Sequence, residues 1–163
     1  MNAQRLETSR LFHRFGFGPR PGEYAQAIKD GVASTRTKIL TVPAIDAGAA
    51  KVVVPNITNL GPRPAANSKE VVPFAIEMRY QVQQMTLWWL DRMALSDNGL
   101  TEKMTWFWHG HWATSIQKLN YPLPMFQQNK TLRANCLGNF ATMTKAMLND
   151  GALQFWLDGQ ENT

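Results

Sequence analysis

The sequence predicts a mainly α-helical protein, an irregular multi-helix bundle with one long loop rich in proline, alanine and glycine. Apolar residues recur at intervals of three and four over several stretches, which is typical of amphipathic helices. The only strand-like run is KVVV at positions 51–54. Prolines punctuate residues 41–69, where the helical period disappears, so we expect an irregular connection there.

Chain length and composition predict a single folded domain. The chain has 163 residues, enough to bury one continuous core, and we take residues 1–163 as one helical domain. Apolar residues make up 44% and charged residues 18%, which fits a globular protein and argues against disorder.

Three short helices are expected before the loop. Residues 4–15 carry Leu6, Leu11 and Phe12 at helical spacing, and Gly16 follows where a helix commonly ends. A second helix is expected from Pro21 to the glycine at position 31, because proline suits an early helical position. A third is expected over residues 34–40.

The best periodic segment is residues 70–96, and it predicts a long core helix. Its apolar residues recur every three or four positions: Phe74, Met78, Val82, Met85, Trp89 and Met93. We expect Thr101 to cap the next helix. Further helices are expected over 125–136 and 139–148, and Asp150 should cap a last short turn through Leu157.

Six tryptophans and one cysteine are expected to serve mainly in packing. The tryptophans lie mostly on apolar helical faces, with Trp88 or Trp106 as the exposed exceptions. Cys136 alone excludes an internal disulfide and a multi-cysteine zinc site, and we expect it to be a small buried apolar residue.

Charge and hydropathy exclude two classes of function. The net charge of +5 and pI near 9.6 favour weak attraction to anionic partners, but the basic residues are scattered, so no specific nucleic-acid binding is expected. No apolar run is long enough for a transmembrane segment. The first residues lack a signal peptide, which predicts a cytoplasmic protein if the chain is complete.

The stretch MTWFWHGHWATS, residues 104–115, holds two of the three histidines. On a helix, His109 and His111 point roughly 200° apart, so joint chelation would need an unwound backbone, for which Gly110 is a hint. One interpretation is that they bind a divalent transition metal or act as acid and base, because neutral imidazole is a good ligand that titrates near neutral pH. The alternative is that both are hydrogen-bonded packing residues.

The final stretch LDGQENT places several oxygen-bearing side chains after an apolar helix: Asp158, Gln160, Glu161 and Asn162. Polar residues at a chain end are usually solvated. If this end folds back, Asp158 and Glu161 could contact a metal or substrate.

Three stretches together resemble the domain-of-unknown-function 1800 family. They are RLFHRFGFGPRPGE at 10–23, MTWFWHGHWATS at 104–115, and RANCLGNFATMTKAMLNDGALQFWLDGQEN at 133–162. Gly110 and Trp112 depart from the family pattern, in which Asn and Phe are usual. Family members run to several hundred residues, so the resemblance implies that this chain is the N-terminal portion of a longer protein whose C-terminal half is missing.

The resemblance implies a helical bacterial protein, frequently exported to the periplasm or outside the cell, and no assigned activity. Our first hypothesis is an enzyme of the cell envelope acting on a polymer or glycan, in which His109 and His111, with Asp158 and Glu161, hold a metal or perform acid–base work. The second is a non-catalytic helical scaffold or binding module that contacts an acidic glycan, a partner protein or the missing C-terminal half.

Overall fold

The protein is mainly α-helical, as the sequence predicts. The structure, a computed structural model, describes residues 3–161, and within that range it contains nine α-helices, two 3-10 turns and no strand. The α-helices are α1 Ala3–Phe15, α2 Glu23–Asp30, α3 Val32–Leu40, α4 Val71–Leu95, α5 Leu100–Trp112, α6 Ile116–Leu119, α7 Pro122–Asn135, α8 Phe140–Leu148 and α9 Gly151–Trp156. The 3-10 turns are η1 Ala49–Lys51 and η2 Gly159–Glu161.

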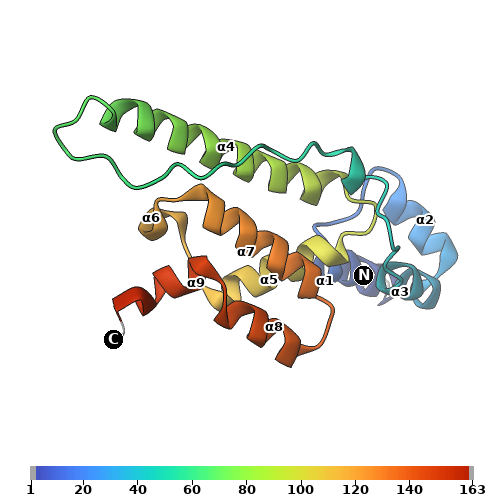
Figure 1. The fold of residues 1–163 in the computed structure, drawn as a ribbon. Coiled ribbons are helices and arrows are strands. Elements are labelled where there is room, and N and C mark those ends of the chain that lie inside the picture. The colour runs from blue at the N-terminus through green and yellow to red at the C-terminus, as the bar shows by residue number, and fades with distance from the viewer. Residues whose placement is uncertain (1–2, 162–163) are drawn as a thin grey trace.

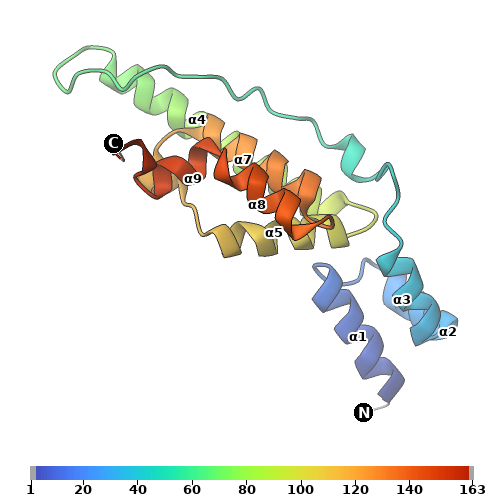
Figure 2. The same ribbon diagram turned by 60° about the horizontal axis from the view of Figure 1, so that its bottom comes forward.

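Two parts can be distinguished in the arrangement of the helices. Helix α4 lies beside α7, α8 and α9 pack on α7, and α5 contacts both α7 and α4 (Figure 1). Helices α1, α2 and α3 contact one another and gather at the end of the bundle where α4 terminates (Figure 2). The polypeptide between α3 and α4 runs back along the length of α4 (Figures 1 and 2).

Helix α7 is the centre of the core. One apolar cluster joins Leu132 of α7 to α8 and α9, a second joins Phe126 to Trp88 of α4, and a third joins Met125 to α6 and α9. The helix therefore contributes a side chain to each cluster. This central position explains why six of the 14 residues of α7 are buried.

The long loop is attached to α4 rather than free. Val52 packs with Trp88 and Phe126. Gln81, which is 1% exposed, accepts a hydrogen bond from the Thr58 backbone N–H at 3.0 Å and donates one to the Thr58 hydroxyl at 2.8 Å. The loop thus covers part of α4 and supplies two hydrogen bonds to a buried polar side chain.

Three distant segments meet at the C-terminal end of α4, which we call the α4 junction (Arg20, Asp46, Asp97 and Asn98). Arg20 donates to Asp97 at 2.7 Å and to the carbonyl of Leu95 at 2.8 Å. Asp46 accepts from the backbone N–H groups of Asp97 and Asn98, both at 2.8 Å. The junction therefore ties the α1–α2 connection and the long loop to the end of α4.

The acid–base behaviour of Asp46 follows from these contacts. Partial burial alone would raise the pKa of its carboxyl, but hydrogen bonds from the Ala49 backbone N–H and the Ser96 hydroxyl, with the N–H groups of residues 97 and 98, lower the pKa to about 2. The carboxyl of Asp46 is therefore ionised at every pH well above 2.

Several expectations need correction. Thr101 lies inside α5, whose cap position is Gly99. Trp88 is buried at 5% exposure because it packs on Phe126, whereas Trp106 is the exposed exception at 52%. Helix α7 begins at Pro122, three residues before the expected start.

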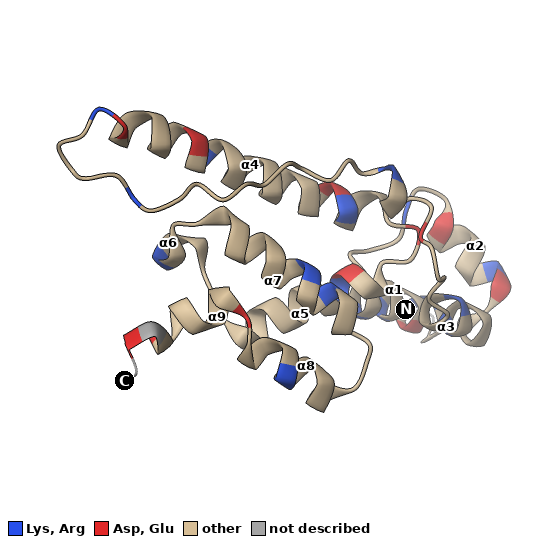
Figure 3. Ribbon diagram, in the orientation of Figure 1, with Lys and Arg blue, Asp and Glu red and all other residues tan. Residues whose placement is uncertain are grey.

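Other expectations are confirmed. The long core helix predicted for residues 70–96 is α4, Cys136 is buried and free, and Asp150 caps α9 by accepting from the Leu153 N–H at 2.9 Å. Lys and Arg are spread over several helices rather than gathered on one (Figure 3). Among the described residues, no helix combines the length and apolarity needed to cross a membrane.

Candidate functional site

The two histidines of the opening motif point away from each other, as helical geometry predicts. Helix α5 continues without interruption through Gly110 to Trp112, and the chain turns only at Ala113, which has a φ of +50°. His109 faces inward and is half-buried, whereas His111 is exposed. The backbone is therefore not unwound between them, and the two imidazoles cannot bind one ion together.

His109 lines a cavity of about 360 Å³ between α4, α5 and α7, which we call the histidine pocket. Helix α4 supplies Met85, Thr86, Trp89, Leu90 and Met93. Other apolar walls are formed by Trp106, Ile116 and Met125. Besides His109, the polar lining residues are Thr86, Thr114, Ser115 and Asn129. A mostly apolar cavity of this size with a few polar groups is typical of a ligand site.

Two polar side chains of the pocket lining, Asn129 and His109, bear on what it can bind. Asn129 is 5% exposed, and its side-chain oxygen Oδ1 has no hydrogen-bond partner. Burial lowers the pKa of His109, so its imidazole is neutral at neutral pH and offers one N–H donor and one acceptor. An unpaired buried carbonyl oxygen is costly, so a donor that reached Asn129 would be bound favourably.

A chain of buried hydrogen bonds supports one side of the pocket. The Thr114 hydroxyl donates to Gln128 Oε1, and Gln128 Nε2 donates to Asp150 Oδ1 at 2.7 Å. All three side chains are at most 6% exposed. Burial raises the pKa of Asp150, and the bonds from Leu153 and Gln128 act in the opposite direction. The pocket wall at Thr114 is thereby connected to the start of α9.

A buried carboxylate next to the pocket joins α4, α5 and α7. Glu102 is 1% exposed and pairs with Arg92 Nε at 2.8 Å and Arg133 Nη2 at 2.9 Å. Burial alone would raise the pKa of Glu102, but the hydrogen bonds and charges of Arg133 and Arg92 keep it below its usual value. Glu102 also accepts from Trp89 Nε1 at 3.1 Å, which fixes the indole that forms one wall of the pocket.

His111 belongs to an aromatic surface rather than to a cavity. Its ring lies 6.4 Å from Phe107 in a stacked arrangement and meets Trp108 and Trp112 edge-on at 5.4 and 5.5 Å. Trp108 in turn stacks on Phe140 of α8 at 5.6 Å. The two histidines therefore have different surroundings, one in the pocket and one on the surface.

The two acidic residues of the final stretch, Asp158 and Glu161, are exposed. Asp158 pairs with Lys118 at 2.8 Å, with both side chains about half exposed. Glu161 is exposed on η2. The side chain of Gln160 and the whole of Asn162 lie outside what the structure describes. None of the interactions described for residues 3–161 joins Asp158 or Glu161 to either histidine.

A metal role for His109 and His111 stays a prediction. Residues 3–161 contain no group of three or more His, Cys, Asp or Glu side chains arranged to hold a metal ion. A lone neutral imidazole in an apolar wall is a weak site, because transition metals in proteins usually have three or four ligands. The surroundings of His109 suit hydrogen bonding to an uncharged group better.

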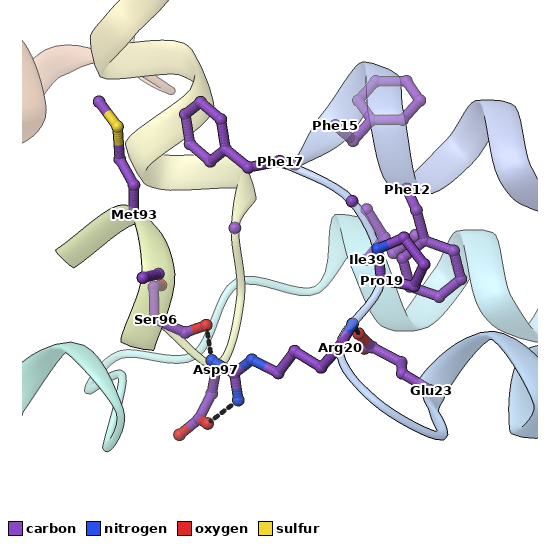
Figure 4. A pocket seen from close by; sticks show the side chains of 14 residues that line it. Phe12, Phe15, Phe17, Pro19, Arg20, Glu23, Ile39, Met93, Ser96 and Asp97 are labelled. Atoms are coloured by element: carbon purple, nitrogen blue, oxygen red, sulfur yellow. Dashed lines mark hydrogen bonds and ion pairs between the residues drawn. The ribbon is translucent and has the colours of Figure 1, made fainter. Parts of the chain in front are cut away.

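The first motif, RLFHRFGFGPRPGE, builds the α4 junction. A cavity of about 210 Å³ lies between α1 and the end of α4, with Phe12 and Phe15 on one side and Met93 and Ser96 on the other, and the ring of Phe17 lies toward Met93 (Figure 4). Gly18 has a φ of +107°, which only glycine adopts readily. This turn directs Arg20 toward Asp97 (Figure 4), so the motif has a clear structural role.

Glu102 and Asn129 were missed by reasoning from the sequence. Glu102 lies one turn before the buried Thr105 on the same face of α5, and a lone acidic residue on that face was the available signal. Asn129 gives no signal by itself, because its importance depends on which helices pack around the pocket.

Comparison with known proteins supports the resemblance drawn from the three motifs. Neither curated proteins nor solved structures yielded a match. One family profile, described as "Protein of unknown function (DUF1800)", matches residues 10–163, which is most of the chain and includes all three motifs. This protein therefore belongs to the DUF1800 family.

Proposed function

We propose that this chain is a binding module whose histidine pocket receives an uncharged aromatic side chain carrying an N–H or O–H group, supplied by a partner protein. The observation that carries the proposal is that Asn129, whose side-chain oxygen Oδ1 has no hydrogen-bond partner, lines a largely apolar cavity of about 360 Å³.

The lining favours this class of group over a charged one. No Asp, Glu, Lys or Arg is among the residues that line the pocket. A charged ligand would therefore lose its hydration without gaining an ionic partner. A hydrocarbon without a donor would leave Asn129 unpaired. An indole or phenol satisfies both conditions, because it combines an apolar ring with one donor.

The same lining argues against an acidic glycan as the ligand of the histidine pocket. Trp89 and Trp106 could stack on a sugar ring. An acidic sugar, however, carries many hydroxyls and a carboxylate, and the pocket offers few polar groups and no cation to pair with them. A protein partner fits the chemistry better.

Paired small molecules test the proposal directly. Indole and benzothiophene have nearly the same shape, but only indole has an N–H donor. We expect indole to bind more tightly by roughly three- to tenfold, the effect of one hydrogen bond. The indole N–H signals of Trp89 and Trp106 in a proton–nitrogen NMR titration report binding at the pocket.

Two variants locate the binding. Asn129→Leu removes the acceptor and should make indole and benzothiophene bind equally, while His111→Asn, outside the pocket, should leave the preference unchanged. Circular dichroism checks that each variant is folded. Equal binding of the two compounds to the unaltered chain, or stronger binding of a uronic-acid disaccharide than of indole, would overturn the proposal.

The enzymatic hypothesis stays a prediction with less support. Acid–base catalysis usually needs a second titratable group beside the histidine, and the lining of the histidine pocket includes no carboxylate. A specific test is metal content of the purified protein, followed by the double variant His109→Ala/His111→Ala. Bound metal that is lost in the double variant would favour the enzymatic hypothesis over the binding module.

A further inference from the structure

Helices α1 and α3 enclose a surface hollow of about 300 Å³ that is lined by three arginines. Arg10 and Arg14 lie one helical turn apart on α1, and Arg36 lies on α3. The two helices contact each other, so cations from two different helices face one space. We call this space the arginine hollow.

The three guanidinium groups have no partner among the residues that the structure describes. The ion pairs found within residues 3–161 use other cations: Arg20, Lys38, Arg92, Lys118 and Arg133. In that range, the side chains of Arg10, Arg14 and Arg36 donate no hydrogen bond. Arg20, which lines the cavity beside the α4 junction, is by contrast paired with Asp97. Three unpaired like charges around one space repel one another and attract an anion.

The ends of the helices account for only one of these cations. Arg14 lies in the last turn of α1, where the helix dipole favours a positive charge. Arg10 and Arg36 lie before the last turns of their helices. The dipole therefore does not explain why the three arginines meet at the same hollow.

We infer that the arginine hollow binds a small phosphate monoester whose organic part is apolar. Among the described residues that line it, Glu7 is the one carboxylate, so three guanidinium groups and one carboxylate leave a formal charge of +2. A phosphate monoester carries a charge of about −2 near neutral pH and so matches this charge. Its oxygens also accept paired hydrogen bonds from guanidinium groups. A carboxylate ligand carries only one charge and would leave the hollow positive.

The apolar part of the ligand is inferred from the side chains beside the arginines. Leu11 and Phe15 each follow an arginine directly in α1, and Val32 lies one turn before Arg36 in α3. All three are half-buried and line the same hollow. A ring or short chain attached to the phosphate would cover them and lose contact with water, which is favourable.

The size of the hollow favours a small molecule over a membrane surface. A volume of about 300 Å³ is at the lower end of the range for small-molecule sites. Segments that bind anionic lipids usually gather about four to eight Lys and Arg residues. The third arginine of α1, Arg5, does not line the hollow. A bilayer is therefore the less suitable partner.

Titration with phenyl phosphate tests this site separately from the histidine pocket. In proton–nitrogen NMR spectra, backbone signals of residues 10–15 and 32–36 should shift, whereas the indole signals of Trp89 and Trp106 should not. Phenyl phosphate should bind at least about threefold more tightly than inorganic phosphate, which has no ring, and than benzyl alcohol, which has no charge. Binding of phenyl phosphate no tighter than either of these compounds would overturn the inference.

Three variants locate the binding at the arginine hollow. Arg10→Gln and Arg36→Gln each remove one cation from a different helix and should weaken the binding of phenyl phosphate about two- to fivefold. Glu7→Gln removes the carboxylate and should strengthen binding about twofold, because a like charge is lost. All three side chains are exposed, so the fold should be retained, which circular dichroism checks.

Arg5→Gln is the matched control, because Arg5 is exposed on the same helix but does not line the hollow. It changes the net charge by the same amount as Arg10→Gln, and we expect it to leave binding unchanged. Equal weakening by the two variants would contradict the inference, because that result indicates general attraction of anions to a basic chain. So would binding to vesicles that contain phosphatidic acid without any shift on addition of phenyl phosphate, because a lipid surface would then be the partner.

Discussion

The rings of Trp89 and His109 meet edge-on, with centroids 5.4 Å apart and planes at 90°. Trp89 is itself held by its indole N–H, which donates to the buried carboxylate of Glu102. His109 therefore packs against an indole that is held by Glu102, the carboxylate of the three-helix ion cluster of Glu102, Arg92 and Arg133. Trp89 therefore links the ion cluster of Glu102 to the geometry of the histidine pocket.

Glu102→Gln should be strongly destabilising. The substitution leaves Arg92 and Arg133, both less than 20% exposed, without their anion, which typically costs about 3 kcal/mol or more. Urea denaturation at pH 7 measures the change. Asp158→Asn removes the exposed pair with Lys118 and should cost less than about 1 kcal/mol. Equal losses in the two variants would contradict this account of the cluster.

The neutral His109 predicts a pH dependence of stability. Burial lowers its pKa in the folded state, so the unfolded chain takes up a proton first as the pH falls below about 6.5. Stability should therefore decrease from pH 7 toward pH 5. His109→Gln should flatten this part of the profile when the free energy of unfolding is measured at several pH values. An unchanged slope in the variant would argue against a buried neutral imidazole.

Asp46 should contribute to acid unfolding. Its folded-state pKa of about 2 lies below that of the unfolded chain, so its contribution is present above about pH 4 and is lost as the pH falls toward 2. Asp46→Asn should be less stable than the unaltered chain at pH 7, and the difference should narrow between pH 4 and 2. A constant difference over that range would mean that the charge of Asp46 is unimportant.

Two glycines should respond in opposite directions to alanine. A Cβ at Gly48 would lie 1.9 Å from the Leu95 carbonyl oxygen, so Gly48→Ala should cost about 1–3 kcal/mol through forced displacement of the α4 junction. At Gly110 a Cβ meets nothing within 4 Å, so Gly110→Ala should stabilise α5 by about 0.5–1 kcal/mol. Thermal unfolding of both variants measures the contrast. Destabilisation by Gly110→Ala would indicate that α5 is not a regular helix there.

The helical fold could be predicted because local signals agree with it. The period of apolar residues marks α4 nearly to its ends, and Asp150 is a cap that sequence alone identifies. Trp88 was misjudged, because its burial depends on Phe126, a residue 38 positions away that packs on it. Sequence periodicity shows which face of a helix is apolar but not what will cover it.

The candidate site could be predicted only in part for the same reason. Helical geometry separates His109 from His111, and the structure agrees with that argument. The walls of the histidine pocket come from α4 and α7 as well, and their convergence depends on packing between helices that are far apart in sequence. Asn129 could not be identified from the sequence, because its distinguishing feature is a side-chain oxygen that has no hydrogen-bond partner in the folded chain.

The α4 junction has a consequence for the order of folding. Its hydrogen bonds join groups that are 49 to 77 residues apart, whereas α1, α2 and α3 contact one another over short separations. Closing long loops is slow and entropically costly, so local helical contacts form first. We therefore expect the N-terminal three helices to attach last, when the end of α4 has already formed and Arg20 can find its partners.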